Sequence, residues 1–249
     1  MIILKSKAEI EAMRRAGQVV ARAHQELRHL IRPGVTTQEL DEFVAEFLAS
    51  QGAEASFKGY QGFPASICAS VNEVVVHGIP GPRRLREGDI ISIDIGAIVD
   101  GYHGDAAWTY PVGEVSQEAR RLMEVGERAL WAAIEKVRPG ARLSDISHAV
   151  QTVVEAAGFS VVRDFVGHGI GRSMHEAPQI PNFGPPGRGP RLKPGMTLAI
   201  EPMVNAGSWE VEILADRWTA VSRDRSLSVH FEHTVAVTEE GADVLTLLP

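Results

Sequence analysis

The chain repeats itself, and this feature constrains its fold most. The tripeptide RPG at 32–34 returns 106 residues later at 138–140. After each copy, apolar residues recur at spacings of three and four and then meet a glycine, Gly52 or Gly158. That spacing predicts an amphipathic helix, and glycine commonly stands just past a helix end. A coincidence of helix signals is disfavoured because several segments align at nearly one offset.

A longer helix is predicted before each copy of the tripeptide. An apolar stripe runs from Ile10 to Ile31, and the stretch 118–137 corresponds to it in the second half. Thr36 and Glu39 form a capping-box pattern at the start of the helix that follows the first copy. The two halves therefore begin with the same pair of helices.

The repeat continues into strands. Segment 85–94 (LREGDIISID) resembles segment 192–201 (LKPGMTLAIE), which lies 107 residues further along. Alternate side chains in both segments point to opposite faces of a sheet. No proline- or serine-rich linker separates the halves. We predict a single α+β domain, 1–249, whose halves of roughly 1–110 and 111–249 share one curved antiparallel sheet covered by helices.

The composition excludes several classes of protein. The chain has 249 residues, 44% of them hydrophobic, which suffices for a core without disulfides or structural zinc. Its single cysteine, Cys68, excludes an intrachain disulfide and cysteine-rich metal sites. A net charge of −7 argues against a chain-wide basic surface for nucleic acid, and the apolar runs are too short to span a membrane. Segment 1–15 lacks the apolar core of a secretion signal, so we expect a cytoplasmic protein.

Four acidic residues fall within predicted strands, where burial without a partner is costly. Asp94 and Asp105 belong to the first half, and Glu201 and Glu232 belong to the second. An approximate twofold relation between the halves would bring the four together, where they repel unless cations neutralise them. Two divalent metals would balance the charge. Carboxylates suit manganese, magnesium or ferrous iron, and an imidazole such as the glycine-flanked His168 extends the range to cobalt and zinc.

The residues around these acids resemble a known family. The ordered acids and histidine resemble the ligand set of the dinuclear metallopeptidases of the pita-bread fold. The segments around them are similar to the type I methionine aminopeptidases, in their short bacterial form: NEVVVHGIP (72–80), GDIISIDIG (88–96), HGIGRSMHEAPQIPNFG (168–184) and DRSLSVHFEHT (224–234). The similarity runs from near the start of the chain to its last predicted strand. It implies removal of an N-terminal methionine that precedes a small uncharged residue.

The resemblance also implies a role for each site residue. Asp94, Asp105, His168, Glu201 and Glu232 would bind two divalent ions (cobalt, manganese, iron, zinc or nickel), with Asp105 and Glu232 as the bridging carboxylates. A metal-bound hydroxide would attack the first peptide bond. Glu201 matches the residue that transfers the proton to the leaving amine.

Further matches to the family concern substrate binding. His175 matches the histidine that stabilises the oxygen of the intermediate, and His77 matches a histidine near the amide beyond the scissile bond. The methionine pocket matches Tyr60, Phe63, Cys68, Met174 and Trp218. Met174 stands where bacterial relatives commonly carry phenylalanine, and Phe63 where some carry tyrosine. A monovalent-cation site of some relatives matches Asn72, Val74 and Ser228.

The histidines outside these motifs are interpreted as surface or core residues. They are His24, His29, His103, His148, His230 and His233. The segment 181–195, rich in glycine and proline, is predicted to be a surface loop.

The alternatives are a proline-specific peptidase of the same fold, a pita-bread binding protein without catalysis, and a sheet domain with no site. Proline-specific relatives usually carry another N-terminal domain, whereas the repeat here begins near residue 8. The family implies methionyl peptides and nascent chains as substrates, a transient ribosome association and a monomer. No direct recognition of nucleic acid or membrane is expected.

Overall fold

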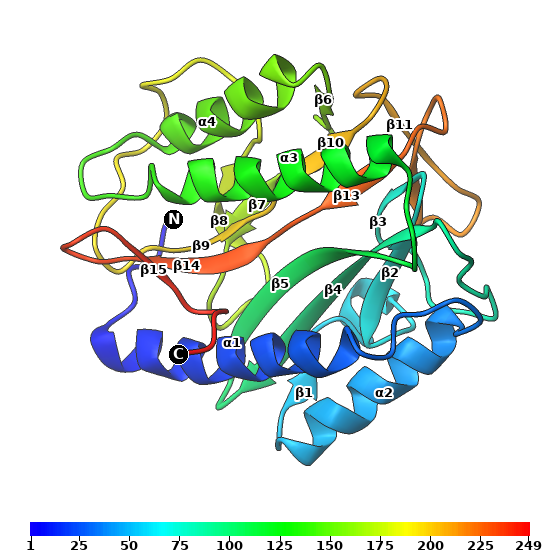
Figure 1. Cartoon of the computed structure of the whole chain (residues 1–249). Coiled ribbons are helices and arrows are strands. Elements are labelled where there is room, and N and C mark those ends of the chain that lie inside the picture. The colour runs from blue at the N-terminus through cyan, green and yellow to red at the C-terminus, as the bar shows by residue number, and fades with distance from the viewer.

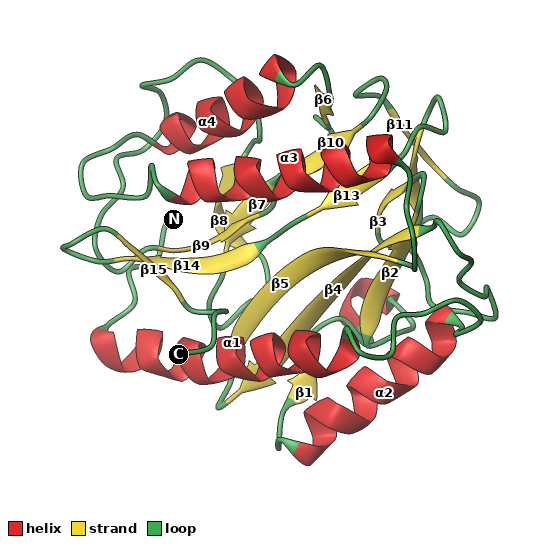
Figure 2. Cartoon of the chain, in the orientation of Figure 1, coloured by secondary structure: helices red, strands yellow, loops and turns green.

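The computed structural model describes all residues, 1–249. Four helices lie against the strands, as Figures 1 and 2 show. In the first half they are α1 (Lys7–Leu27) and α2 (Thr37–Ser50), and in the second half α3 (Gln117–Ile134) and α4 (Leu143–Ala156). A 3-10 turn, η1, spans Tyr60–Gly62. None of the helices has the length and apolar content needed to cross a bilayer.

Local sequence signals position these helices. The predicted capping box at α2 is confirmed: the Glu39 N–H donates to Thr36 Oγ1 at 3.1 Å, and the Thr36 N–H donates to the Glu39 carboxylate at 2.7 Å. The helix predicted to reach Ile31 ends at Leu27 instead. A proline follows shortly at position 33, and the residue before a proline is disfavoured in helical geometry.

The strands form four hydrogen-bonded sheets, so the prediction of one shared sheet is wrong. One large sheet has the order β1-β4-β2 with β5 on β4, and the other has the order β15-β14-β9-β7-β8. Two small sheets, β13-β10-β6 and β11-β12-β3, complete the structure. The strands of the first half are β1 (Glu54–Ala55), β2 (Ile67–Val71), β3 (Val74–Val76), β4 (Ile90–Val99) and β5 (Tyr102–Pro111). Those of the second half are β6 (Ser160–Val161), β7 (Gly167–Gly169), β8 (Glu176–Ile180), β9 (Thr197–Ile200), β10 (Met203–Asn205), β11 (Val211–Ile213), β12 (Ala220–Ser222), β13 (Ser228–His230), β14 (His233–Val237) and β15 (Ala242–Val244).

Two acids predicted inside strands lie just beyond strand ends. Glu201 follows β9, and Glu232 lies between β13 and β14. Pro202, next to Glu201, has no N–H to donate to a ladder. The Glu232 N–H donates instead to the Ala107 carbonyl of β5, at 2.8 Å. The same breaks that split the sheet of the second half therefore free the two glutamates to enter the space between the halves.

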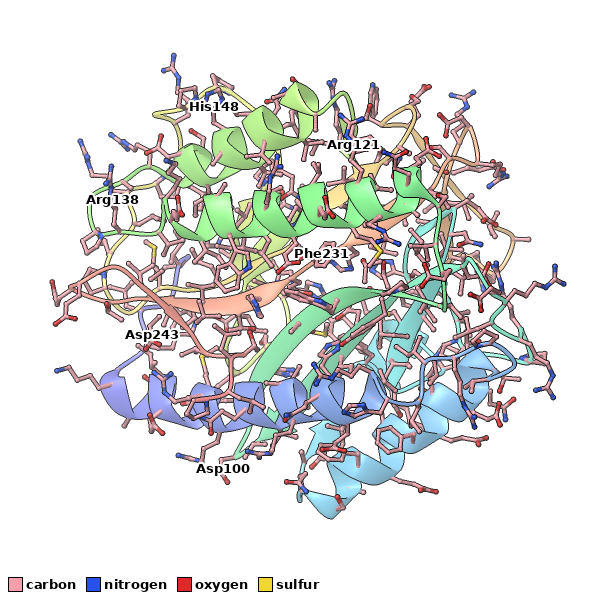
Figure 3. The ribbon with its side chains drawn as sticks, in the orientation of Figure 1. Asp100, Arg121, Arg138, His148, Phe231 and Asp243 are labelled. Atoms are coloured by element: carbon pink, nitrogen blue, oxygen red, sulfur yellow. The ribbon has the colours of Figure 1, made fainter.

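Each half has its own hydrophobic core. In the first half, α1 packs on β4 and β5, and α2 packs on α1, β1 and β2, around residues such as Leu27, Leu40 and Ile93. In the second half, α3 packs on α4, β9, β10 and β13, and α4 packs on β6 and β8, around Phe231 and its neighbours. Figure 3 shows Phe231 between α3 and the strands. Helices thus cover one side of the strands.

Buried hydroxyl groups join the two halves along a seam, which we define as the contact of β5 with β13 and β14. The Thr234 hydroxyl accepts from the Asp105 N–H at 3.0 Å and donates to the Asp105 carbonyl at 2.8 Å. Thr109 does the same for His230: its hydroxyl accepts from the N–H at 3.1 Å and donates to the carbonyl at 2.9 Å. Side chains therefore replace a backbone ladder here, and they fix the backbone of Asp105.

We expect Thr234→Val to destabilise the protein. The substitution keeps the shape but leaves two buried backbone groups of Asp105 without a partner, a loss of about 1–3 kcal/mol for such groups. Urea denaturation of the metal-loaded protein measures this loss in the free energy of unfolding. Thr152→Val, at an exposed position of α4, is the control and should unfold with the wild type. Equal midpoints for wild type and Thr234→Val would show that the seam hydroxyl contributes nothing.

Candidate active site and metal centre

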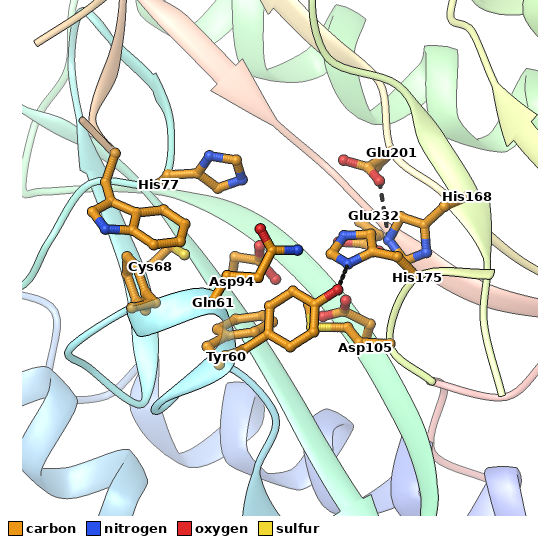
Figure 4. Close-up of a pocket in the computed structure, with 14 residues that line it drawn as sticks. Tyr60, Gln61, Cys68, His77, Asp94, Asp105, His168, His175, Glu201 and Glu232 are labelled. Carbon is orange, nitrogen blue, oxygen red and sulfur yellow. Dashed lines mark hydrogen bonds and ion pairs between the residues drawn. The ribbon is translucent and has the colours of Figure 1, made fainter. Parts of the chain in front are cut away.

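A cavity of about 160 Å³ lies between the two halves, and it gathers every predicted catalytic, pocket and divalent-metal residue. Figure 4 shows the side chains that line it. The predicted residues are Tyr60, Phe63, Cys68, His77, Asp94, Asp105, His168, Met174, His175, Glu201, Trp218 and Glu232. Two further residues, Phe57 and Gln61, complete the lining. The structure therefore brings the predicted residues together in one cavity.

The four acids reach the cavity from both halves. Asp94 on β4 and Asp105 on β5 lie on paired strands, where Asp94 is opposite Ala107 and Asp105 is opposite Gly96. Both point to the same face, because Asp94 is paired with Ala107, which lies two residues from Asp105 on β5. Glu201 and Glu232 enter from the strand breaks described above. The seam between the halves thus becomes an acidic centre.

Three of the five predicted ligands form a compact cluster. One side-chain atom from each of Asp105, His168 and Glu232 can be chosen so that all lie within 4.8 Å of one another. Glu201 Oε1 is 3.5 Å from His168 Nε2, and Asp94 lines the same cavity. All five side chains are therefore brought to one place, with three of them at its centre.

The acids have the unmet bonding capacity of a cation site. The buried oxygens Asp94 Oδ1, Asp105 Oδ1 and Glu232 Oε1 have no hydrogen-bond partner. A buried carboxylate oxygen without a partner is costly, and a cation relieves that cost. Carboxylate oxygens with a single imidazole nitrogen suit manganese, iron, cobalt or zinc. The donor set fits divalent metal.

Without cations, the acids hold protons more tightly than usual. Burial, then the charges of Asp105, Glu201 and Asp94, raises the pKa of Glu232 well above its ordinary value. Burial and the charges of Asp105 and Glu201 do the same for the pKa of Asp94. Burial raises the pKa of Asp105 to about 7. Cations in the cavity would reverse this, because they favour the ionised carboxylates.

His168 is held in the form that binds metal. Its Nδ1 lies 2.9 Å from the Gly169 carbonyl, so the proton sits on Nδ1 and the lone pair of Nε2 is free. Burial, and next the charge of His175, lowers the pKa of His168 to about 4, so the ring is neutral. The structure places it in β7.

The glycines on either side of His168 allow the neighbouring strands to approach closely. A Cβ at Gly167 would lie 2.5 Å from the Ala199 carbonyl oxygen of β9. A Cβ at Gly169 would lie 2.2 Å from the Ala177 carbonyl oxygen of β8. Glycine therefore lets the neighbouring strands close tightly on both sides of His168.

The other two predicted histidines lie on opposite sides of the cavity. His175 precedes β8, and its Nδ1 is 2.8 Å from the Tyr60 hydroxyl. Its ring centroid is 4.2 Å from that of His168. His77 follows β3 with φ +59°, a conformation that is uncommon outside glycine. Its ring makes an edge contact with Trp218 at 6.4 Å between centroids.

The wall beside the acids is apolar. A buried cluster joins Phe57, Phe63, Ala65, Cys68 and Met174, with Tyr60, Ile79 and Trp218 packed against it. Phe63 and Trp218 meet edge to face at 5.2 Å between centroids. Burial, then the nearby acids, raises the pKa of the Cys68 thiol, which makes it a wall and not a nucleophile.

His230 lies beside the acids, although we interpreted it from the sequence as a surface or core residue. Its Nε2 is 3.6 Å from Glu201 Oε2 and 4.0 Å from Glu232 Oε2. The signal was present, because His230 stands two residues before Glu232 near the end of a strand. Burial lowers the pKa of His230 to about 3. Gln61 and Phe57 had no comparable signal in the sequence.

The remaining histidines do not line this cavity. His24 contacts the Tyr110 hydroxyl, His103 contacts Ser56, and His233 contacts Thr246. His29 and His148 are exposed on the surface.

The residues matched to a monovalent-cation site also lie together. The Ser228 N–H donates to the Asn72 carbonyl at 2.8 Å. Val74 begins β3, two residues after Asn72. The Ser228 hydroxyl is buried and has no partner.

We expect metal to determine both the stability of the protein and its pH dependence. In the chelated protein, Asp105 binds its proton up to about pH 7, whereas the ordinary value is 3.8. At this carboxyl the folded state then holds more protons than the unfolded state, so the contribution of Asp105 to stability falls as pH rises through this window. The buried histidines act in the opposite sense, because burial lowers the pKa of His168 to about 4 and that of His230 to about 3. Melting curves in chelator should therefore show a wild-type Tm that declines from about pH 5 to 7 relative to the Tm of Asp105→Asn. Added Mn²⁺ should raise Tm at pH 7, since a ligand at 100 times its Kd contributes about 2.7 kcal/mol.

Asp105→Asn tests the source of this effect. It removes one buried charge, so it should raise the Tm of the chelated protein at neutral pH and abolish most of the gain from Mn²⁺. A Tm difference between chelated Asp105→Asn and chelated wild type that does not grow from about pH 5 to 7 would contradict this explanation.

Comparison with known proteins agrees with this geometry. The model of metallopeptidase family M24 matches residues 11–239. Methionine aminopeptidase 1 of Bacillus subtilis is 59% identical over 246 residues, and the match covers 99% of both chains. The crystal structure of a methionine aminopeptidase from Thermotoga maritima has a TM-score of 0.98 and 49% identity, and the match covers 100% of both chains.

A more distant match separates this chain from the proline-specific branch. A prolidase from Pyrococcus furiosus has a TM-score of 0.80 and 25% identity, and the match covers 99% of this chain but only 66% of the prolidase. The α+β pita-bread fold predicted from the sequence is confirmed by these structures. The chain belongs to metallopeptidase family M24 and, within it, to the methionine aminopeptidases.

Proposed function

We propose that this protein removes the N-terminal methionine from peptides and nascent proteins in a metal-dependent hydrolysis. One observation carries the proposal: a buried set of four acids and a histidine opens onto an apolar wall within the same cavity. Full-length similarity to methionine aminopeptidases supports the choice of methionine.

The residues that would hold two divalent cations are Asp94, Asp105, His168, Glu201 and Glu232. Bound cations supply Lewis-acid polarisation and lower the pKa of water near the scissile bond. Their identity is proposed to be cobalt, manganese, iron, zinc or nickel, since oxygen and imidazole donors accept all of these.

Glu201 is proposed to move the proton. Its carboxylate lies in the cavity, 3.5 Å from His168 Nε2, and is positioned to take a proton from the attacking water and give it to the leaving amine. His175 is proposed to donate a hydrogen bond to the substrate carbonyl oxygen. The Tyr60 hydroxyl at its Nδ1 favours a proton on Nε2, which leaves that N–H free to donate.

The apolar wall is proposed to hold the methionine side chain. Phe63, Cys68, Met174 and Trp218 supply aromatic and sulfur neighbours for an unbranched thioether, and Tyr60 closes one side. His77, in contact with Trp218, is proposed to meet the amide beyond the scissile bond. A small second residue is then favoured because the space there is crowded.

We also propose finer assignments. The whole chain, 1–249, acts as a single catalytic domain with halves of roughly 1–110 and 111–249, since both halves contribute acids to one cavity. A monovalent cation binds near Asn72, Val74 and Ser228, where a buried hydroxyl lacks a partner. The protein works as a cytoplasmic monomer that meets nascent chains through transient ribosome association, as expected from the family resemblance.

The substrate preference can be tested directly. The proposal expects release of free methionine from Met-Ala-Ser that stops in chelator and returns with added metal, and much slower release from Met-Trp-Ser. Chelator sensitivity separates the enzyme from a binding protein of the same fold. Equal rates on the two tripeptides would contradict the proposed crowding, and preferential cleavage of Ala-Pro peptides would indicate a proline-specific peptidase.

His168 and His175 should respond differently to metal. His168→Ala removes a proposed ligand, so it should lower both metal affinity and rate, and excess metal should restore part of the rate. His175→Ala removes a proposed donor, so kcat should fall by about 10²–10³ with metal binding unchanged. Calorimetric titration measures the metal affinity of each variant, and steady-state kinetics measure its kcat. A His175→Ala enzyme with normal kcat would remove His175 from the mechanism.

A further inference from the structure

The side chain of His230 is buried, lies against the acids, and has no partner of its own. It is 3% exposed, and its Nε2 makes no hydrogen bond. The nearest carboxylate atoms are Glu201 Oε2 at 3.6 Å and Glu232 Oε2 at 4.0 Å. The first of these distances is slightly longer than a hydrogen bond, so a small rotation of Glu201 would close the contact.

The backbone of His230 is fixed unusually firmly. Its N–H lies 3.1 Å from Thr109 Oγ1 and 3.2 Å from Ser92 Oγ, and its carbonyl accepts from the Thr109 hydroxyl at 2.9 Å. His230 is also paired with Met203 of β10, two residues after Glu201. The backbone that carries the His230 imidazole is therefore held in place beside the strand break at Glu201.

The surroundings of the ring determine where its proton sits. With cations bound and both acids ionised, a lone pair on Nε2 would face two carboxylates and be repelled by both. With the proton on Nε2, the ring offers an N–H to the same oxygens, which are strong acceptors. No other hydrogen-bond acceptor contacts Nε2.

We infer that His230 is a positioning residue for Glu201: its Nε2–H donates a hydrogen bond to the Glu201 carboxylate and holds it toward the metal centre. The inference deepens the proposed function and rests on it, because Glu201 is the proposed proton carrier. A carboxylate that serves a cation with one oxygen and a proton with the other needs a fixed orientation. Outer partners of metal-binding groups commonly give that orientation.

Three substitutions test the role of the N–H group. His230→Leu removes the donor, whereas His230→Gln keeps one, because its amide nitrogen stands three bonds from Cβ as the imidazole Nε2 does. His233→Leu is the matched control. His233 is also buried, and its Nε2 also has no partner. Its ring packs between Trp108 and Trp131 and does not line the cavity that holds the acids.

The experiment measures Mn²⁺ affinity by calorimetry and kcat and KM on Met-Ala-Ser for each purified variant. We expect His230→Leu to lose about 10–100-fold in kcat or Mn²⁺ affinity, with KM for the peptide within about twofold of wild type. His230→Gln should recover most of the loss. His233→Leu should bind Mn²⁺ as the wild type does, whatever it does to stability.

Two outcomes would overturn the inference. One is unchanged kcat and Mn²⁺ affinity in His230→Leu, and the other is a loss in His230→Gln as large as in His230→Leu, which would indicate packing alone. If His230→Leu fails to fold, the comparison of His230→Gln with His230→Asn decides, because Asn carries the same amide on a shorter stem and should lose the effect. Failure of the wild type to release methionine would instead reject the proposed function, and the Mn²⁺ affinities would still test His230.

Discussion

Mutual repulsion among four buried carboxylates is the constraint on which the rest of this structure depends. Asp94, Asp105, Glu201 and Glu232 line one cavity, and several of their oxygens have no protein partner. Hydrophobic cores exist on either side, but the centre between them is destabilising by itself. The protein can keep these groups ionised only with cations present, and that requirement makes the site suited to metal-dependent hydrolysis.

Buried hydrogen bonds hold the seam between the halves rigid despite this repulsion. Hydroxyl groups of Thr109 and Thr234 bind the backbones of His230 and Asp105, so the two halves meet through side chains where a ladder is interrupted. The interruption is useful, because it turns Glu201 and Glu232 out of the sheets and into the cavity. Stability and site geometry therefore come from the same few buried polar contacts.

Much of the fold and of the candidate site could be predicted from local and chemical signals in the sequence. The helix caps, the repeat and the five proposed ligands could be read directly, because propensity and charge depend on residue type. The strand break at Glu232 could not, since it arises from a contact of its N–H with the Ala107 carbonyl, far away in the chain, whereas the break at Glu201 has a local signal in Pro202. His230 was missed for a similar reason: its neighbour Glu201 is 29 positions away, and only the pairing of β10 with β13 brings them together.

Anomalous diffraction at the manganese edge from crystals soaked in Mn²⁺ tests the central claim most directly. We predict two anomalous peaks in the cavity. They should mark two ions that are bound by oxygens of the four acids, with Nε2 of His168 bound to one of the ions. An empty cavity at saturating Mn²⁺, or peaks confined to surface acids, would contradict it.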